Sequence, residues 1–161
     1  MEIMRASIRD LGPLGRLERA CFDQDAWSFL DLVAVLTVPT VVRLKAMDGN
    51  EMIGFVAGDP RSSLGWAWIA TVGVHPRFRR KGTGRALLRA CEARLSLPLI
   101  KLTVRPSNTT AVAMYESEGY ETIDVWERYY RDGEDGAVMQ KEMPAAGAPA
   151  THSDPAGTQA T

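Results

Sequence analysis

Apolar residues repeat along the chain with two periods, one typical of helices and one typical of strands. Leu11, Leu14, Leu17 and Cys21 follow one another at steps of three and four residues, which predicts a helix. Comparable spacing, together with capping residues, predicts helices at residues 11–22, 28–36, 83–95 and 108–118. Apolar runs between turn residues predict strands at residues 3–7, 41–46, 52–57, 66–74, 99–104, 120–126 and 137–143.

The order of these elements predicts an α/β or α+β domain around one mixed sheet. Strands dominate the first half, where Asp48-Gly49-Asn50 predicts a hairpin, and helices alternate with strands later. We expect a single domain over residues 1–143. Residues 144–161 contain no aromatic and no large aliphatic side chain, so we expect a disordered, low-complexity tail there.

The composition argues against a nucleic-acid or membrane-surface binder, because such proteins carry a basic excess and this chain has a net charge of -1. Cys21 and Cys91 are too few for a disulfide framework or a zinc site, so we expect no metal. The first residues lack the apolar stretch of a signal peptide, and no apolar run reaches about 18 residues. We therefore expect a cytoplasmic protein.

A local cluster of positive charge follows the predicted strand 66–74. The segment RRKGTG, residues 79–84, leads directly into the next predicted helix. A helix N-terminus exposes free N–H groups and a partial positive charge, and glycines let a ligand approach the backbone. We interpret this turn as a site for a small anion such as a diphosphate, the alternative being a solvated basic turn. A dinucleotide fingerprint does not fit, because Leu87 stands where its third glycine belongs.

The turn resembles the phosphate loop of the GNAT superfamily of acyl-CoA-dependent N-acyltransferases, [QR]-x-x-G-x-[GA] after a strand ending V-x-P. A second family segment, V-R-x-x-N-x-x-A-x-x-x-Y-x-x-x-G-[FY], is matched by residues 104–120. The stretch YYRDGEDG, residues 129–136, is similar to the YY-x-D-G-E-D-A signature of protein N-terminal acetyltransferases, including the RimI type. Asp25-Ala26-Trp27-Ser28 resembles that group's P-W-S.

The resemblance implies a mixed, mostly antiparallel sheet of about seven strands, splayed in the middle, with about four flanking helices. It also implies acetyl-CoA as the acetyl donor, with its pyrophosphate on the glycine turn and its pantetheine arm along strand 66–74. The cofactor-binding residues that it implies are Val72, Val74, Arg79, Arg80, Lys81, Gly82, Thr83, Gly84, Arg85, Asn108 and Tyr115.

Acyl transfer needs a neutral amine, a stabilised oxyanion and a proton for the leaving thiolate. By resemblance, Tyr115 donates that proton and the amide of Val74 binds the thioester oxygen, although Tyr115 taken alone also fits a core aromatic residue. RimI-like enzymes carry a glutamate base just before the V-R pair, where this chain has Thr103, whose hydroxyl can hold a water but cannot accept a proton at neutral pH. The other candidate bases are His75, Glu121, Asp124 and Glu127.

The missing glutamate matters less for an α-amine than for a lysine. With a pKa of ~8 an α-amine is about one-tenth neutral at pH 7, a cost of about 1.4 kcal/mol, whereas a lysine costs about 4.6 kcal/mol. We therefore expect transfer to a protein or peptide N-terminal α-amine by direct attack in a ternary complex. The alternatives are a small-molecule amine acetyltransferase and a CoA-binding regulatory module without turnover.

On the acceptor side, the resemblance implies a groove walled by the tyrosines of the YYRDGEDG stretch. Asp23 and Asp25, between the first two predicted helices, could attract a cationic amine or could simply cap helices in solvent. The implied substrate-binding residues are Asp25, Trp27, Thr103, Tyr129 and Tyr130. The sequence leaves the oligomeric state open.

Overall fold

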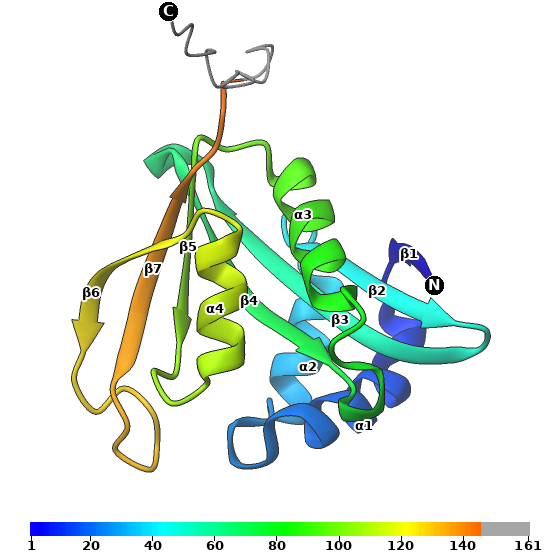
Figure 1. The fold of residues 1–161 in the computed structure, drawn as a ribbon. Coiled ribbons are helices and arrows are strands. Elements are labelled where there is room, and N and C mark those ends of the chain that lie inside the picture. The colour runs from blue at the N-terminus through cyan, green and yellow to red at the C-terminus, as the bar shows by residue number, and fades with distance from the viewer. Residues whose placement is uncertain (146–161) are drawn as a thin grey trace, which may run out of the picture.

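One seven-stranded sheet runs through the described part of the chain, residues 1–145, in the computed structural model (Figure 1). The strand order is β1-β2-β3-β4-β5-β7-β6, and every neighbouring pair is antiparallel except β4 with β5. The strands are β1 (Glu2–Arg5), β2 (Val42–Asp48), β3 (Glu51–Arg61), β4 (Trp66–Val74), β5 (Leu99–Val104), β6 (Glu121–Trp126) and β7 (Gly136–Glu142). Residues 146–161 of the expected tail, His152 among them, lie outside the described residues.

Helices cover both faces of the sheet. In residues 1–145 these are α1 (Leu11–Phe22), α2 (Phe29–Thr37), α3 (Thr83–Leu95) and α4 (Thr109–Ser117). Adjacent residues of β3 point to opposite faces of the sheet. Phe55 packs on the face that carries Leu14 of α1 and Leu36 of α2, whereas Val56 packs on the face that carries Leu87 of α3. Helices α3 and α4 lie in front of the sheet in Figure 1, and α1 and α2 lie behind it. None of the described helices combines the length and hydropathy needed to cross a bilayer.

The predicted fold class is confirmed, with seven strands and four α-helices in residues 1–145. Predicted and observed boundaries agree to within two residues except at β3, which continues to Arg61 instead of ending at Ala57. Residues 58–60, Gly-Asp-Pro, have the composition of a turn, but they pair with residues 67–69 of β4. Cross-strand pairing therefore overrides the local turn preference at this point.

Candidate functional site

The two central strands, β4 and β5, separate after a short parallel contact. Residues 66–68 of β4 pair with residues 99–101 of β5, and the recorded pairing between the two strands stops there. Strand β4 nevertheless continues to Val74, and β5 continues to Val104. The sheet is thus splayed in the middle, as the family resemblance implied.

A β-bulge on β4 marks the point of separation. On the β3 side, Ala57 pairs with Thr71 and Gly58 pairs with Ile69, so Ala70 is the extra residue. The alternation of buried and more exposed side chains along β4 is interrupted from this residue to Val72. Because a bulge bends a strand and increases its twist, this residue accounts for the departure of β4 from β5.

Beyond the bulge, backbone groups of β4 point into the gap. The backbone N–H of His75 donates to the carbonyl oxygen of Ile53 in β3 at 2.9 Å. Alternate residues of a strand direct their backbone groups to opposite sides, so Val72 and Val74 direct theirs away from β3. The carbonyl oxygen of Val74 instead accepts a hydrogen bond from Arg79 Nε at 3.0 Å. The gap is therefore edged by backbone donors and acceptors that another extended group could pair with.

The basic glycine turn connects the end of β4 to α3 (Figure 1). Arg80 and Gly82 both have left-handed backbone conformations, with φ of 62° and 81°, and Gly82 is the N-cap of α3. Thr83, the first residue of the helix, is 3% exposed. This geometry leaves the first N–H groups of α3 without helical acceptors, which is the arrangement that binds anions.

The positively charged side chains of this turn differ in their interaction partners. The Arg85 guanidinium lies 2.9 Å from Glu118, and Arg79 holds the Val74 carbonyl oxygen. The Lys81 ammonium lies 5.4 Å from the centre of the Phe78 ring. Within the described residues, no carboxylate forms an ion pair with Arg80 or Lys81. These two side chains therefore carry the positive charge available to a bound anion.

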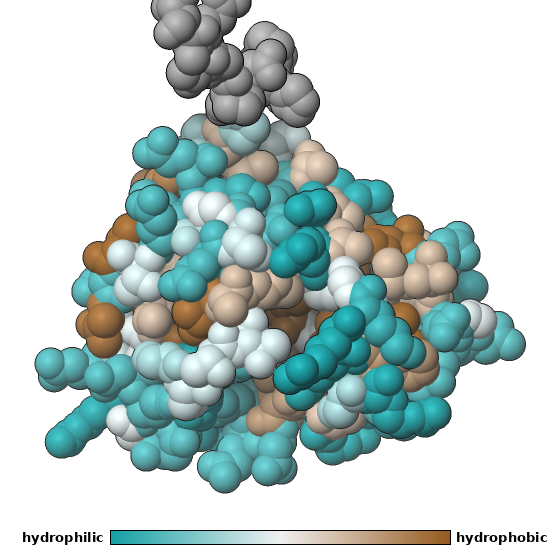
Figure 2. All heavy atoms as spheres, viewed as in Figure 1, coloured by the Kyte–Doolittle hydropathy of each residue, from teal (hydrophilic) through white to brown (hydrophobic). Residues whose placement is uncertain are grey.

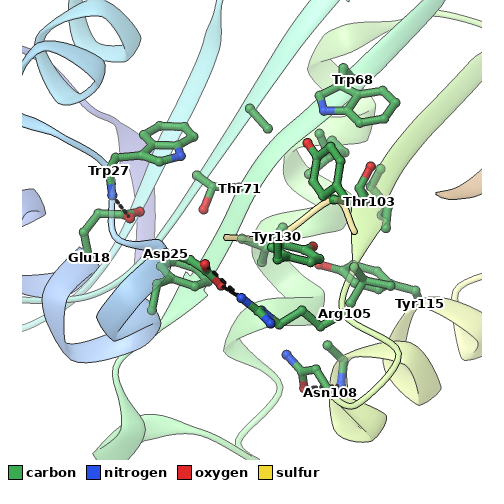
Figure 3. A pocket seen from close by; sticks show the side chains of 18 residues that line it. Glu18, Asp25, Trp27, Trp68, Thr71, Thr103, Arg105, Asn108, Tyr115 and Tyr130 are labelled. Carbon is green, nitrogen blue, oxygen red and sulfur yellow. Dashed lines mark hydrogen bonds and ion pairs between the residues drawn. The ribbon is translucent and has the colours of Figure 1, made fainter. Parts of the chain in front are cut away.

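A cavity of about 250 Å³ occupies the gap between β4 and β5. Its walls come from these two strands, from α4, from α1 and the turn that follows it, and from the loop between β6 and β7 (Figure 3). On the face that carries α3 and α4, Figure 2 shows the surface hollowed between α4 and the start of α3. The predicted site residues that line the cavity are Asp25, Trp27, Val72, Thr103, Asn108, Tyr115, Tyr129 and Tyr130. Val74 and residues 79–85 lie outside its lining, at the end of β4 and the start of α3.

Asn108 and Tyr115 both reach this cavity from α4. Asn108 is the N-cap, and its Oδ1 accepts a hydrogen bond from the Ala111 N–H at 3.2 Å. Tyr115 is 7% exposed, and its ring packs edge-on against Tyr120 at 5.7 Å. Burial raises the pKa of Tyr115 above its ordinary value. The phenol therefore stays protonated at neutral pH, in the form that can donate a proton.

Thr103 has an unpaired hydroxyl. Its Oγ1 is buried and has no hydrogen-bond partner among the described residues, although Thr103 lines the cavity. Gly136 of β7 lies so close that a β-carbon at that position would be 2.7 Å from the Thr103 methyl group. Buried hydroxyls are normally paired, so this one would gain a partner if the side chain turned toward a molecule bound in the cavity.

Arg105 joins three segments at the edge of the cavity. Its guanidinium donates to both oxygens of Asp25, at 2.7 and 2.9 Å, and to Asp132 at 2.9 Å. It also lies 4.0 Å from the centre of the Tyr130 ring. Asp25, expected to attract a cationic amine, is therefore already paired with a cation. Three segments far apart in the sequence meet at this one side chain.

Sequence reasoning missed Glu18 and Trp68, which both line the cavity (Figure 3). A signal for Glu18 was present, because it lies on the apolar stripe of α1, four residues after Leu14. Trp68 lies in the predicted strand at residues 66–74, where nothing in the pattern marked it as a site residue, and its ring stacks on Trp126 at 5.8 Å. Burial raises the pKa of Glu18 from 4.5 to about 7, and its Oε2 accepts one hydrogen bond from the Trp27 N–H at 3.3 Å.

The other candidate bases lie outside the cavity lining. Glu121, Asp124 and Glu127 are exposed on or next to β6. His75 accepts a hydrogen bond from the Arg77 N–H through its Nδ1 and lines a separate hollow with Pro13. In residues 1–145, no group of three or more His, Cys, Asp and Glu side chains is arranged to hold a metal ion.

The sequence and the fold were compared with known proteins. The profile of the acetyltransferase (GNAT) family matches residues 12–120. The uncharacterized N-acetyltransferase MJ1530 of Methanocaldococcus jannaschii is 30% identical over 155 residues, which cover 92% of this chain and 96% of that protein.

Two solved structures combine a similar fold with about a quarter of identical residues. The ribosomal-protein-S18-alanine N-acetyltransferase of Escherichia coli superposes with a TM-score of 0.81 at 26% identity, over 91% of this chain and 96% of the other. Naa20 of Chaetomium thermophilum, solved with a bisubstrate analogue, superposes with a TM-score of 0.74 at 26% identity, over 89% of this chain and 87% of the other.

Proposed function

Because the chain belongs to the acetyltransferase (GNAT) family, we propose that it transfers the acetyl group of acetyl-CoA to the N-terminal α-amine of a protein or peptide. It is an acyltransferase by family, and the proposal concerns the donor, the acceptor and the residues that act. The observation that carries it is the gap between β4 and β5, with outward-facing backbone on one strand and Tyr115 opposite.

The residues around the gap suit an acyl-CoA. The backbone N–H and carbonyl of Val72 can pair with the amides of a pantetheine arm as an added strand would, and Val74, whose carbonyl accepts from Arg79, keeps its N–H free. The free N–H groups at the start of α3, with Arg80 and Lys81, suit its pyrophosphate. The unpaired Thr103 hydroxyl would add one polar contact if its side chain turned toward the cavity.

In this proposal the thioester lies where the end of β4 meets the cavity, between Val74 and Tyr115. The Val74 N–H donates to the thioester oxygen, where negative charge develops during attack. Tyr115 donates a proton to the sulfur as the C–S bond breaks. Asn108, on the same face of α4, contacts the pantetheine arm. The amine attacks directly while both substrates are bound, so no acetylated side chain of the enzyme is formed.

Two arguments favour an N-terminal amine as the acceptor. An α-amine needs about 3 kcal/mol less than a lysine to become neutral at pH 7. The E. coli relative, which is 26% identical over nearly its whole length, is named for an alanine of a ribosomal protein, which makes its acceptor a protein. The aromatic residues Trp27, Tyr129 and Tyr130 would wall the groove along which the peptide enters.

Thiol release from acetyl-CoA tests the proposal against peptides with free N-termini and a panel of small amines. We expect turnover with peptides and a loss of at least about 100-fold in Tyr115→Phe, with acetyl-CoA affinity unchanged. Turnover with small amines alone would contradict the proposed acceptor. Tight CoA binding without turnover of any amine would contradict the catalytic role and favour a regulatory module.

A further inference from the structure

Glu18 is a buried acid that the proposed mechanism does not yet use. Its side chain arises from α1, lines the cavity and belongs to a residue that is 3% exposed. The other two buried acids are neutralised, Asp10 by Lys45 at 2.6 Å and Glu92 by Lys141 at 2.9 Å. Among residues 1–145, no Lys, Arg or His forms an ion pair with Glu18. A buried carboxylate without a cation is costly to keep and calls for a reason.

The hydrogen bond from Trp27 to Glu18 anchors the segment after α1, but it does not explain why a carboxylate is buried here. Oε2 accepts the backbone N–H of Trp27 at 3.3 Å, which is long for such a bond. One weak hydrogen bond leaves Oε1 free, and a neutral glutamine would make the same contact. Since burial moves the pKa of Glu18 to about 7, the group can take up and release a proton near neutral pH.

The position of Glu18 relative to Tyr115 suits a base and an acid acting on one reaction. In Figure 3, Glu18 and Trp27 approach the cavity from one side, and Tyr115 approaches it from the opposite side. An amine that attacks between them would have the base on its own side and the proton donor beside the leaving group. Thr103, which occupies the position of the family's usual glutamate, cannot serve as that base.

We propose that Glu18 is the general base of the acetyl transfer, a role that rests on the proposed function. The lone pair of the neutral amine forms the C–N bond, and one N–H proton passes to Glu18 Oε1. The C–S bond breaks, and the sulfur takes a proton from Tyr115. The proton on Glu18 then leaves to solvent and Tyr115 regains one, so the enzyme returns to its starting state.

The other ionisable groups near the cavity are paired, strongly shifted by burial, or directed elsewhere. Asp25 and Arg105 are paired with each other. Burial raises the pKa of Cys21, on α1, to about 11 and that of Tyr130 to about 12. Arg79 lies beside Cys21, and His75 lines a different hollow. A change in rate near pH 7 therefore reports on Glu18 and on the acceptor amine.

The test compares Glu18→Gln with the wild type, using a peptide with a free N-terminus. Glutamine keeps the size of the side chain and the acceptor for Trp27, and it removes only the basicity. We expect kcat/KM at pH 7 to fall by at least about 100-fold with acetyl-CoA affinity unchanged. Below pH 7, the slope of log(kcat/KM) against pH should drop from about 2 to about 1, because only the amine still has to lose a proton. Glu116→Gln, on the exposed face of α4, should change neither.

Equal rates and equal pH profiles for wild type and Glu18→Gln would overturn the assignment of Glu18 while leaving the acetyl transfer standing. A lower rate with an unchanged slope would also overturn it, because that result describes a structural anchor. If the wild type acetylates small amines only, the same comparison is made with the best amine. If it acetylates no amine, both the proposed function and the base are overturned. A carboxyl resonance that titrates near pH 7 in ¹³C-glutamate-labelled wild type and is missing from Glu18→Gln supports the ionisation directly.

Discussion

The guanidinium of Arg105 binds the carboxylate of Asp25 through two hydrogen bonds, at 2.7 and 2.9 Å, across 80 positions of sequence. The same guanidinium reaches Asp132 and Glu134 in the loop before β7. Arg105 therefore joins the two segments that wall one side of the cavity. In the proposed function this side is the acceptor groove, so its shape depends on this one cation.

Arg105→Gln should loosen that groove. We expect the KM for the peptide to rise at least about tenfold with a smaller change in acetyl-CoA affinity, because the Arg105 side chain bonds to none of the proposed cofactor-binding residues. The free energy of unfolding should fall by about 1–3 kcal/mol, since three carboxylates lose their partner. Arg61→Gln is the matched control, because its ion pair with Asp59 is on the surface and should be worth less than about 1 kcal/mol. Equal effects of the two substitutions on KM would contradict this role of Arg105.

Gly82→Ala should weaken coenzyme A binding through the backbone. The φ of 81° at Gly82 is strained for any side chain, although no atom lies within 4 Å of the added β-carbon. The substitution should cost about 1 kcal/mol of stability and move the N–H groups at the start of α3. Gly49→Ala provides the control, since Gly49 has a φ of 57°, equally open surroundings and a place in the distant β2–β3 turn. Isothermal titration of coenzyme A should separate them, with a higher Kd only for Gly82→Ala.

Glu18 should make the protein less stable as the pH rises. Its pKa is raised from 4.5 to about 7 on folding, so the folded state binds the proton more tightly than the unfolded state. The stability that this proton contributes is present below pH 4.5 and is lost as the pH rises toward 7. The side chain of Glu18→Gln carries no charge. The free energy of unfolding of this variant should therefore exceed that of the wild type by up to about 3 kcal/mol at pH 8 and by little at pH 4. Urea unfolding at the two pH values measures the difference, and a constant difference would contradict it.

Thr103→Val should separate stability from function. Valine has nearly the shape of threonine and removes the unpaired Oγ1, so the unliganded protein should gain about 1 kcal/mol. Turnover should fall, because the cavity loses its polar contact at the position beside Gly136. Thermal unfolding and steady-state kinetics on the same sample check both effects. A variant that is less stable and equally active would show that the hydroxyl is satisfied in solution and takes no part in turnover.

The fold was largely predictable because local patterns and pairing agree in most elements. The helix at Leu11–Phe22 and the strand at Trp66–Val74 were predicted to the residue. The same local patterns could not place Glu18, because a single acid on an apolar stripe says nothing about what it faces across a sheet. Arg105 was likewise visible as half of the V-R pair, but its partners lie in two loops whose approach depends on the tertiary structure.

Residues of the predicted site are easiest to place together when they share one element, although their roles stay a prediction. Asn108 and Tyr115 share α4, and both reach the cavity. The bulge at Ala70, which opens the gap between β4 and β5, leaves no mark in the composition of β4. It arises from the register of β4 against β3, and that register depends on contacts distant in sequence.

The proposed function depends most on which amine receives the acetyl group. A peptide that carries both a free N-terminal α-amine and an internal lysine should be incubated with the protein and acetyl-CoA and then fragmented in a mass spectrometer. We expect the α-amine to be acetylated and the lysine to stay unmodified. Acetyl groups on the lysine, or a peptide left unmodified by protein that binds acetyl-CoA, would contradict it.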